Sequence, residues 1–509
     1  MAQRRIHIIG DHDMVPHIVR KYQDIGEYPI KFGSFQDYHI HEMPDEIVIA
    51  TSVTDGASPI SEDMRNTAYI AALLKDNIIE KQVRVHMLTH TPDIMSMMQT
   101  WDLEKSIQDK VEIYPFSFES LWAGKITCPS LTKDSDMPPL DREPIGKDSD
   151  KCVHLVIFGM NAMAQEIAKH AALVCHFPNY TRDHSLRTRI TIVDSHIDDA
   201  MGDFVGRHEH LFANSFHRFI DLANTESNVV KSIHKPQFHG TREDFIDVEW
   251  EFVKGGINSE ILRQKLGYWA ASDRQQLTVV LCSDDEGENM RTAMKMPSGI
   301  GDNRIPVFFR TADAAMLQML TSTKMPDIIP FGMNGHTLDV TMPLIRMAKV
   351  VNHVYDCYYN DNYTPVEIDW KKADESWKKL SNAKKWSNIY NAMAVATKMR
   401  SLGYTVHDWD TLYCLSAQEV DYLAEVEHNR WCIEELLLGY RPANDLEQKA
   451  IEENITLKKT YRDRFIHYDL RSYKDLREDA TGKNVNVYDI CISEALPLIV
   501  NAFIKGGQA

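Results

Sequence analysis

The stretch VHLVIFGMNAMAQEIAKHAALVC, residues 153–175, decides how the rest of the chain is interpreted. It begins with an unbroken apolar run, 153–158, which is typical of a parallel strand that is buried on both faces of a sheet. Gly159 follows, and small or apolar side chains then recur at helical spacing up to Cys175. A buried strand, a glycine turn and a helix predict a doubly wound α/β domain with a parallel sheet.

Strand-like and helical segments continue to alternate up to about residue 350. The further strand candidates are 189–194, 245–253, 277–282 and 305–310. This alternation predicts that 151–350 forms one Rossmann-like domain.

A weaker copy of the same pattern occupies residues 1–126. IVIATSVTD (47–55), then 62–74 and VRVHMLTHTPD (83–93), parallels TVVLCSDDEGENMRTAM (278–294) followed by IPVFFRTAD (305–313). The shared order indicates an internal duplication, so we predict tandem doubly wound domains that pack together as a pseudo-dimer. Between them, 127–150 contains four prolines and five aspartates without a hydrophobic period, and we predict a linker.

The last third of the chain has helical patterns. Residues 370–403 are helical in spacing, and Ser416 with Glu419 forms an S-x-x-E capping box at the start of a further helix. Gly439 and Pro442 are typical of the end of that helix. No long strand-like run is present, so we predict an all-α domain over 351–509.

The charge balance excludes some classes of partner. The chain has 56 Lys and Arg against 74 Asp and Glu, a net charge of −18. This excess of negative charge argues against a general nucleic-acid or anionic-membrane surface. The longest apolar run, 496–503, is too short for a transmembrane helix, which needs about 20 residues. We expect a cytoplasmic protein with no inserted membrane segment and no bound nucleic acid.

Residues 159–164, GMNAMA, are a variant of the phosphate-binding loop G-x-G-x-x-G. Gly159 permits the tight turn, and the small Ala164 lets the helix approach the strand. The amides at the start of the helix offer partial positive charge to a phosphate. Asn161 replaces the second glycine, and Asp194 ends the next strand, where a carboxylate accepts hydrogen bonds from ribose. The alternative is a sheet of the same type whose pocket is empty.

Residues 153–340 resemble the TrkA-N/RCK family of nucleotide-binding regulators of potassium transport, and 4–122 resemble it in degenerate form. In that family an acidic stretch ends a strand, an Asn opens the next helix and an Arg ends the following strand. The resemblance implies NAD or another adenine nucleotide as the ligand. The site residues that it implies are Gly159, Asn161, Ala164, Asp194, Ser283, Asp284, Asn289 and Arg310. The first copy has Gly10-Asp11-His12-Asp13 at its loop, whose acids repel phosphate, so we expect no ligand there.

The helix expected over 417–438 combines a core face with an aromatic residue among acids. Leu423, Val426 and Ile433 recur at helical spacing, with Arg430 among them. Trp431 aligns with glutamates on the other side, which is typical of a pocket wall. The alternative is a tryptophan packed on a neighbouring helix, with the acids in solvent.

The pattern of 423–442, then HYDLRSYKDL (467–476) and a last helix after Asp489, resembles the RyR domain, a small helical repeat first named in ryanodine receptors. The resemblance covers about 415–500 and implies a nucleotide-derived ligand or a protein partner. Its landmarks are Glu425, His428, Trp431, Gly439, Tyr440, His467, Tyr473, Leu476 and Asp489. The pocket candidates are Glu427, His428, Arg430, Trp431, Tyr440 and Tyr473.

Together these patterns predict a non-catalytic nucleotide sensor that acts on a membrane transporter or another effector protein, either alone or as a homo-oligomer. An NAD(P)-dependent oxidoreductase is the alternative, although the C-terminal part has no recognisable Tyr/Lys or His/Asp pair for proton transfer. A scaffold without ligands is a third reading. We expect no metal site, because His208-Glu209-His210 supplies only two ligands at a spacing that diverges on a helix.

Overall fold

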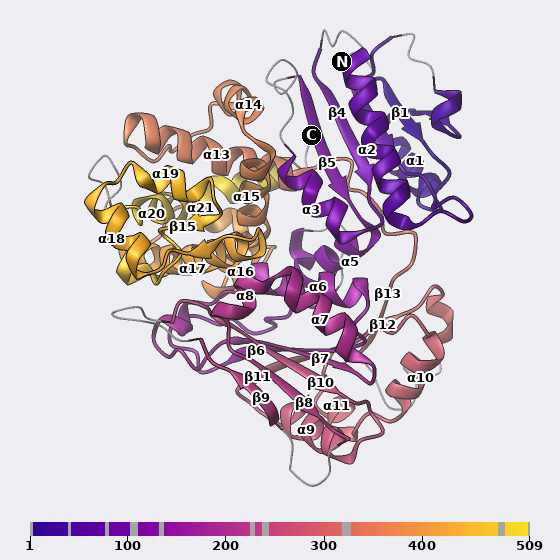
Figure 1. Cartoon of the computed structure of the whole chain (residues 1–509), viewed down its shortest axis with the longest axis vertical. Helices are drawn as coiled ribbons and strands as arrows, with labels where there is room; N and C mark the ends of the chain where they lie inside the picture. Colours follow the sequence, from indigo (N-terminus) through magenta and orange to yellow (C-terminus); the bar gives the residue numbers. More distant parts are fainter. Residues whose placement is uncertain are drawn as a thin grey trace.

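The computed structural model describes residues 4–38, 42–76, 81–101, 110–131, 137–223, 230–236, 244–317, 327–476 and 484–506. These residues form two sheets with their helices and a helical block beside them (Figure 1). The chain is therefore a mixed α/β protein with parallel sheets, as the sequence predicts.

The first sheet has the order β2-β1-β3-β4-β5, and all its strands are parallel. Alternate residues of its strands enter two different apolar clusters, so both faces are buried: Ile9 and Ile49 contact one cluster, and Ile8 and Val48 the other. Its elements are β1 (Ile6–Ile9), α1 (Val15–Asp24), β2 (Ile30–Phe32), β3 (Glu46–Ile49), α2 (Pro59–Asp76), β4 (Val83–Leu88), α3 (Pro92–Thr100), β5 (Val111–Phe116) and α5 (Phe118–Thr127).

The second sheet has the order β13-β12-β11-β6-β7-β10-β8-β9, parallel except for the edge strand β9. Its strands are β6 (Cys152–Phe158), β7 (Thr188–Asp194), β8 (His217–Asp221), β9 (Val230–His234), β10 (Val248–Lys254), β11 (Gln275–Leu281), β12 (Val307–Arg310) and β13 (Ile328–Phe331). The five segments predicted as strands from 153 to 310 are confirmed. The β8–β9 hairpin was not predicted, because its short runs lack a clear hydrophobic alternation.

Helices cover both faces of the second sheet. Leu155 and Ile157 contact the cluster that contains α6 (Ala162–Val174), whereas Val156 and Phe158 contact the cluster of α9 (Glu260–Ala270). The remaining helices are α7 (Ile197–Arg207), α8 (Glu209–Asn214), α10 (Glu286–Met294) and α11 (Ser298–Asp302).

The helical block packs against the second sheet through α6, which contacts both α15 and α17. Its helices are α13 (Pro343–Asp361), α14 (Trp370–Lys379), α15 (Asn382–Met393), α16 (Val395–Ser401), α17 (Ala417–Leu437), α18 (Asp445–Glu453), α19 (Leu457–Arg462), α20 (Val487–Glu494) and α21 (Leu496–Gly506). A short parallel pair, β14 (Arg441–Pro442) with β15 (Ile466–His467), interrupts an otherwise helical region. The predicted capping box is confirmed, since Glu419 accepts a hydrogen bond from the Ser416 amide at 2.7 Å.

The predicted linker differs from a free spacer. Of the predicted linker, the structure describes 127–131 and 137–150: α5 ends at Thr127 and a 3-10 helix spans Pro129–Leu131, whereas 137–150 contain no helix or strand. Leu140 and Ile145 are nevertheless buried, and Asp141 forms a buried ion pair with Arg400 of α16 at 2.7 Å. The segment is therefore packed and ion-paired against the helical block. Its proline and aspartate content did not indicate this packing.

Taken singly, none of the helices in the described ranges is long and apolar enough to cross a membrane. Helices α20 and α21 meet that test of length and composition only when combined across a 46° bend. Ile492, Leu496 and Ile499 of this pair are buried in the main core.

Candidate functional site

A cleft of about 320 Å³ opens at the carboxyl ends of the central strands of the second sheet. Within the sheet, β6 has β7, the next strand along the chain, as its neighbour on one side and β11 as its neighbour on the other. Connections that leave a parallel sheet in opposite directions create a crevice at this point. Helices α6, α9 and α10 follow β6, β10 and β11, so their N-termini face the cleft. Its polar lining includes Asn161, Asp194, Asn258, Ser259, Ser283, Asp284, Glu288, Arg291 and Lys295.

Gly159 makes the turn between β6 and α6, as predicted. Its φ is +112°, and a Cβ atom there would lie 3.2 Å from the backbone carbon of Cys282. Any other residue would be strained both by this φ value and by the neighbouring strand. Glycine is therefore required at the floor of the cleft.

Asn161 fastens the loop in place instead of adopting a glycine-like conformation. Its φ is −78°, and its Oδ1 accepts a hydrogen bond from the Ala164 amide at 3.0 Å, which caps α6. Its Nδ2 donates to the Cys282 carbonyl at 2.6 Å. The substitution of the second glycine thus gives a rigid turn that is tied to β11.

Some backbone amides at this end of the sheet already donate hydrogen bonds to a carboxylate of the protein itself. Asp194 ends β7, as predicted, and its carboxylate accepts hydrogen bonds from the amides of Met160 at 3.0 Å and His196 at 2.7 Å. The amides of Asn161, Ala162 and Met163 have no acceptor among the described residues. A carboxylate has about four acceptor positions, so Asp194 retains capacity for further donors.

The opposite wall contains the residues implied by the family resemblance. Asn289 is buried; its Oδ1 accepts from the Ser283 amide at 2.9 Å and its Nδ2 donates to the Arg310 carbonyl at 3.2 Å. It therefore joins the ends of β11 and β12. The expectation that it opens the helix is wrong, because Asp285 caps α10 one turn earlier. Arg310 ends β12, as expected, and pairs with Asp284 at 2.5 Å without lining the cleft.

Sequence reasoning missed one wall of the cleft. Gly255 and Gly256 follow β10, and Ser259 caps α9. Lys295 donates to the Asn258 side chain at 2.6 Å and has no carboxylate partner among the described residues. The signal that could have located this wall is KGGINS, a glycine pair and a capping serine directly after a strand.

The loop of the first sheet also requires its glycine. Gly10 has φ +125°, and a Cβ atom there would meet the Ala50 carbonyl oxygen at 2.1 Å. Asp11 accepts a hydrogen bond from the Ser52 amide, and the buried Asp63 accepts from the amides of His90 and Thr91. At this end of the sheet, carboxylates therefore accept from the amides of Ser52, His90 and Thr91.

In the helical block, two of the pocket candidates form a buried ion-pair network. Arg430 donates to Glu427 at 2.8 Å and to Glu434 at 2.6 Å, and Lys398 of α16 donates to Glu427 at 2.6 Å. All four side chains are at most 3 % exposed. Although burial acts in the opposite direction, Arg430 and Lys398 lower the pKa of Glu427 to about 2. Helix α17 is therefore buried on nearly all sides. The expectation that its glutamates lie on a polar face opposite the core face is wrong.

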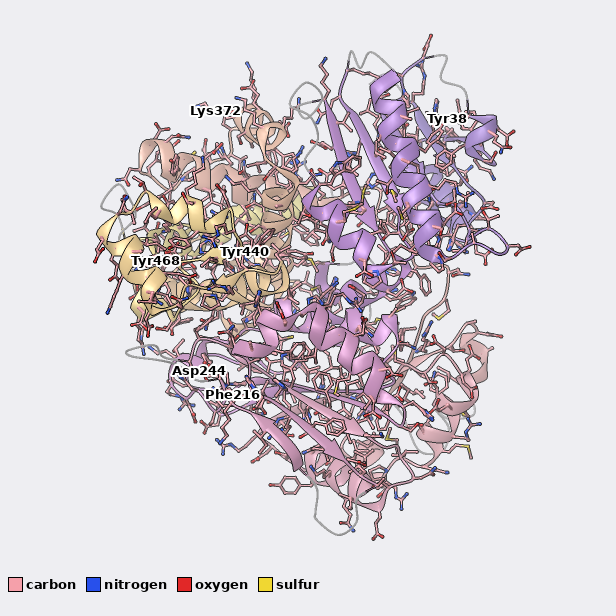
Figure 2. All side chains as sticks on the ribbon, in the orientation of Figure 1. Tyr38, Phe216, Asp244, Lys372, Tyr440 and Tyr468 are labelled. Carbon is pink, nitrogen blue, oxygen red and sulfur yellow. The ribbon has the colours of Figure 1, made fainter. Side chains whose placement is uncertain are left out.

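The other candidates gather in an aromatic cluster. Trp431 meets His467 edge to face with ring centroids 4.9 Å apart, and Tyr440 lies 5.8 Å from the same ring within the side-chain packing of the block (Figure 2). The ring centroid of His428 lies 5.6 Å from that of Trp431 and 5.9 Å from that of Tyr473. Burial lowers the pKa of His467 to about 3, so its ring is neutral at pH 7. A hollow of about 10 Å³ lies beside Tyr473, which is room for one water.

One acid beside this network gives a prediction of pH dependence. Burial, together with the charge of Glu434, raises the pKa of Glu435 to about 8 from 4.5. The folded state therefore binds this proton more tightly, and the stabilisation is complete below pH 4.5 and is lost as the pH rises through about 8. We expect Glu435→Gln to flatten the pH dependence of the free energy of unfolding between pH 5 and 8 by about 1 kcal/mol per pH unit. Equal slopes for both proteins in urea titrations would contradict this assignment.

Comparison with protein-family models, with curated proteins and with solved structures finds no match for this chain. Among the residues that the structure describes, no group of three or more His, Cys, Asp or Glu side chains is placed to hold a metal ion. The cleft of the second sheet is accordingly assigned from its own geometry, as a polar crevice with unpaired helix amides.

Proposed function

We propose that the chain is a nucleotide-binding regulatory protein whose ligand, NAD or another adenine nucleotide, occupies the cleft of the second sheet. The strand order supports a Rossmann-like fold: β6 is central, β7 and β10 follow on one side, and β11, β12 and β13 follow on the other. This is the order of dinucleotide-binding domains. The observation that carries the proposal is that the amides of Asn161, Ala162 and Met163, beside the glycine turn, have no acceptor in the part of the chain that the structure describes.

In this proposal the loop amides hold phosphate oxygens, because the N-terminus of α6 carries partial positive charge. Asp194 accepts from ribose hydroxyls with its remaining acceptor positions. Lys295 supplies a positive charge from the opposite side of the cleft, where Ser283 and Asp284 complete the wall. The TrkA-N/RCK resemblance supports the same division of roles.

The regulatory part of the proposal rests on the position of α6. One end of this helix faces the cleft, and its buried side contacts α15 and α17 of the helical block. A ligand that favours one placement of α6 would shift the block by no more than its difference in affinity for the two states. We propose that the block, an RyR-like domain, transmits this change to a membrane transporter or another effector protein.

The lining of the cleft favours a sensor over an oxidoreductase. Hydride transfer to a carbonyl substrate requires a proton donor at the reacting atom. The described lining residues include no His, Cys or Tyr. The groups of the lining that exchange protons are its acids and Lys295, and Lys295 already donates to the Asn258 side chain at 2.6 Å.

Equilibrium titration calorimetry with NAD⁺, NADH, ATP and a cyclic dinucleotide tests the proposal. We expect saturable binding of at least one of them, without oxidation of NADH when candidate carbonyl substrates are added. Turnover of NADH would establish the oxidoreductase alternative. If none of the four nucleotides binds, the remaining interpretation is a scaffold without ligands.

A further inference from the structure

A histidine at the carboxyl end of the first sheet contacts a hydrogen-bond acceptor with each nitrogen of its ring. This residue is His90, which follows β4. Its Nδ1 lies 2.8 Å from Oδ1 of Asp63, a residue of α2. Its Nε2 lies 3.0 Å from the carbonyl oxygen of Thr51, which follows β3. The side chain of His90 is 13 % exposed, so the ring can exchange protons with solvent.

Neither acceptor has a proton to give to the ring. A backbone carbonyl has none. The Asp63 carboxylate accepts hydrogen bonds from the amides of His90 and Thr91, each at 2.9 Å, and from the Thr91 hydroxyl at 2.8 Å. A histidine ring donates through both nitrogens only as the imidazolium cation. The two contacts of the ring are therefore both hydrogen bonds only when His90 carries two protons.

Charged and titratable groups from three other elements face the ring. Burial lowers the pKa of His90, but the hydrogen bond and charge of Asp63, with the charge of Glu62, outweigh burial and hold this pKa above 6.5. His12 of the β1–α1 loop lies 6.0 Å away, ring centroid to ring centroid. Burial and the charge of His90 lower the pKa of His12, so the second ring is neutral at pH 7. Glu119 of α5 also faces His90, whose charge opposes the rise in the pKa of Glu119 that burial causes.

The peptide group that His90 contacts is held on its other side as well. Its carbonyl belongs to Thr51, and its N–H belongs to Ser52, which donates to Oδ1 of Asp11 at 2.9 Å. Asp11 lies in the loop that follows β1. One peptide group therefore joins the loops that follow β1, β3 and β4, and His90 connects it to α2 through Asp63.

The repeat in the sequence gives His90 a counterpart in the second sheet. Two short motifs occur in both copies, EDMR (62–65) as ENMR (288–291) and HTPD (90–93) as RTAD (310–313). His90 therefore takes the place of Arg310. A guanidinium keeps its charge at every pH at which proteins are folded, whereas an imidazole titrates near neutral pH. The first copy thus has a titratable cation where the second has a permanent one.

We propose that His90 is a pH-dependent switch of the first sheet: as the imidazolium it holds the Thr51–Ser52 peptide to Asp63, and the loss of one proton releases this peptide. The carboxylate retains the proton on Nδ1, because a hydrogen bond to an ionised acceptor is the stronger of the two. Nε2 then presents a lone pair to the Thr51 carbonyl, which is repulsive. This response needs no nucleotide, so it goes beyond the proposed function of the second sheet.

The direction of the pH effect follows from linkage. The folded protein binds the second proton of His90 more tightly than the unfolded chain does. The stabilisation by the imidazolium is therefore complete below pH 6.5 and is lost as the pH rises through the higher pKa of the folded protein.

The first test is a titration of the full chain labelled with ¹⁵N-histidine. Long-range ¹H–¹⁵N correlation spectra report which ring nitrogens carry protons, and the signals of His90 are those absent from the spectrum of His90→Asn. Below pH 6.5 we expect protons on both nitrogens of His90. As the pH rises, we expect Nε2 to lose its proton with a midpoint above 6.5, while Nδ1 keeps its proton.

The second test is hydrogen exchange of the Ser52 amide, corrected for the intrinsic effect of pH on exchange. In the wild type we expect exchange to become about tenfold faster as the pH rises through the His90 midpoint, because one hydrogen bond of this peptide is lost. His90→Asn retains a donor near the position of Nδ1 and has none at that of Nε2, so fast exchange is expected at every pH. His407→Asn is the matched control, since His407 is exposed in the helical block, and wild-type behaviour is expected.

Three results would overturn the proposal. They are a single proton on the His90 ring below pH 6.5, a midpoint at or below 6.5, and Ser52 exchange that is equal in the wild type and in His90→Asn over the whole titration. Amide shifts of the second sheet that match the wild type establish that both Asn variants are folded. His90→Gln supplies the same assignment if His90→Asn does not fold, so the titration of the wild-type ring decides in either case.

Discussion

Replacing Arg430 with methionine is expected to lower the free energy of unfolding by about 3–5 kcal/mol, because the change leaves buried charges without their partner. Arg430 is the shared donor of Glu427 and Glu434, and its side chain is 2 % exposed. Methionine preserves much of the apolar volume, so the loss reports the charge and not a cavity. Urea denaturation followed by tryptophan fluorescence measures the effect.

Arg441→Met is the control for this variant. Arg441 also pairs with a glutamate, Glu447, at 2.7 Å, but its side chain is 35 % exposed. Exposed ion pairs contribute less than about 1 kcal/mol, so this change should hardly move the urea midpoint. Equal midpoint shifts for Arg430→Met and Arg441→Met would contradict the assignment of α17 as a structural helix fastened by buried ion pairs.

Ala162→Asp is expected to weaken nucleotide binding at least tenfold without destabilising the fold. Ala162 is exposed at the first position of α6, where an acid interacts favourably with the helix N-terminus. The same acid repels a phosphate on the loop amides: two unit charges about 5 Å apart interact by about 3 kcal/mol at an effective dielectric constant of about 20. Calorimetric titration with the nucleotide that the wild type binds measures the change.

The neutral variant Ala162→Asn separates charge from shape. It has nearly the same side-chain volume as the aspartate and is expected to bind within about threefold of the wild type, well inside the tenfold step of 1.4 kcal/mol. If both variants bind as the wild type does, phosphate does not rest on the amides of α6. If both lose binding equally, crowding explains the loss, and the electrostatic account is wrong.

Much of the second sheet could be predicted from the sequence, because buried parallel strands are continuous apolar runs. The run before Gly159 and the acid at Asp194 were located correctly for this reason. Such runs do not determine the order of the strands in the sheet. It depends on which helices cover which face, and this is a property of the whole core.

Tertiary packing decided the features that the sequence did not reveal. On a helical wheel Arg430 lies among the core residues, whereas Glu427 looks like a surface charge, and its pairing with Arg430 and with Lys398 of α16 makes its burial tolerable. One cavity is likewise lined by both His86 and Thr337, residues far apart in the chain that no local pattern relates. Periodicity predicts which faces are buried, whereas it does not predict which charges are buried with them.

The most direct test of the central claim is an amide TROSY spectrum of the full chain, titrated with NAD⁺ or with the adenine nucleotide that calorimetry identifies. The account requires saturable shifts of the amide resonances of Asn161, Ala162 and Met163 with one common dissociation constant, while the amides of the first loop at Asp13 and Met14 stay unchanged. Nucleotide binding that leaves the three α6 amides unshifted would contradict it.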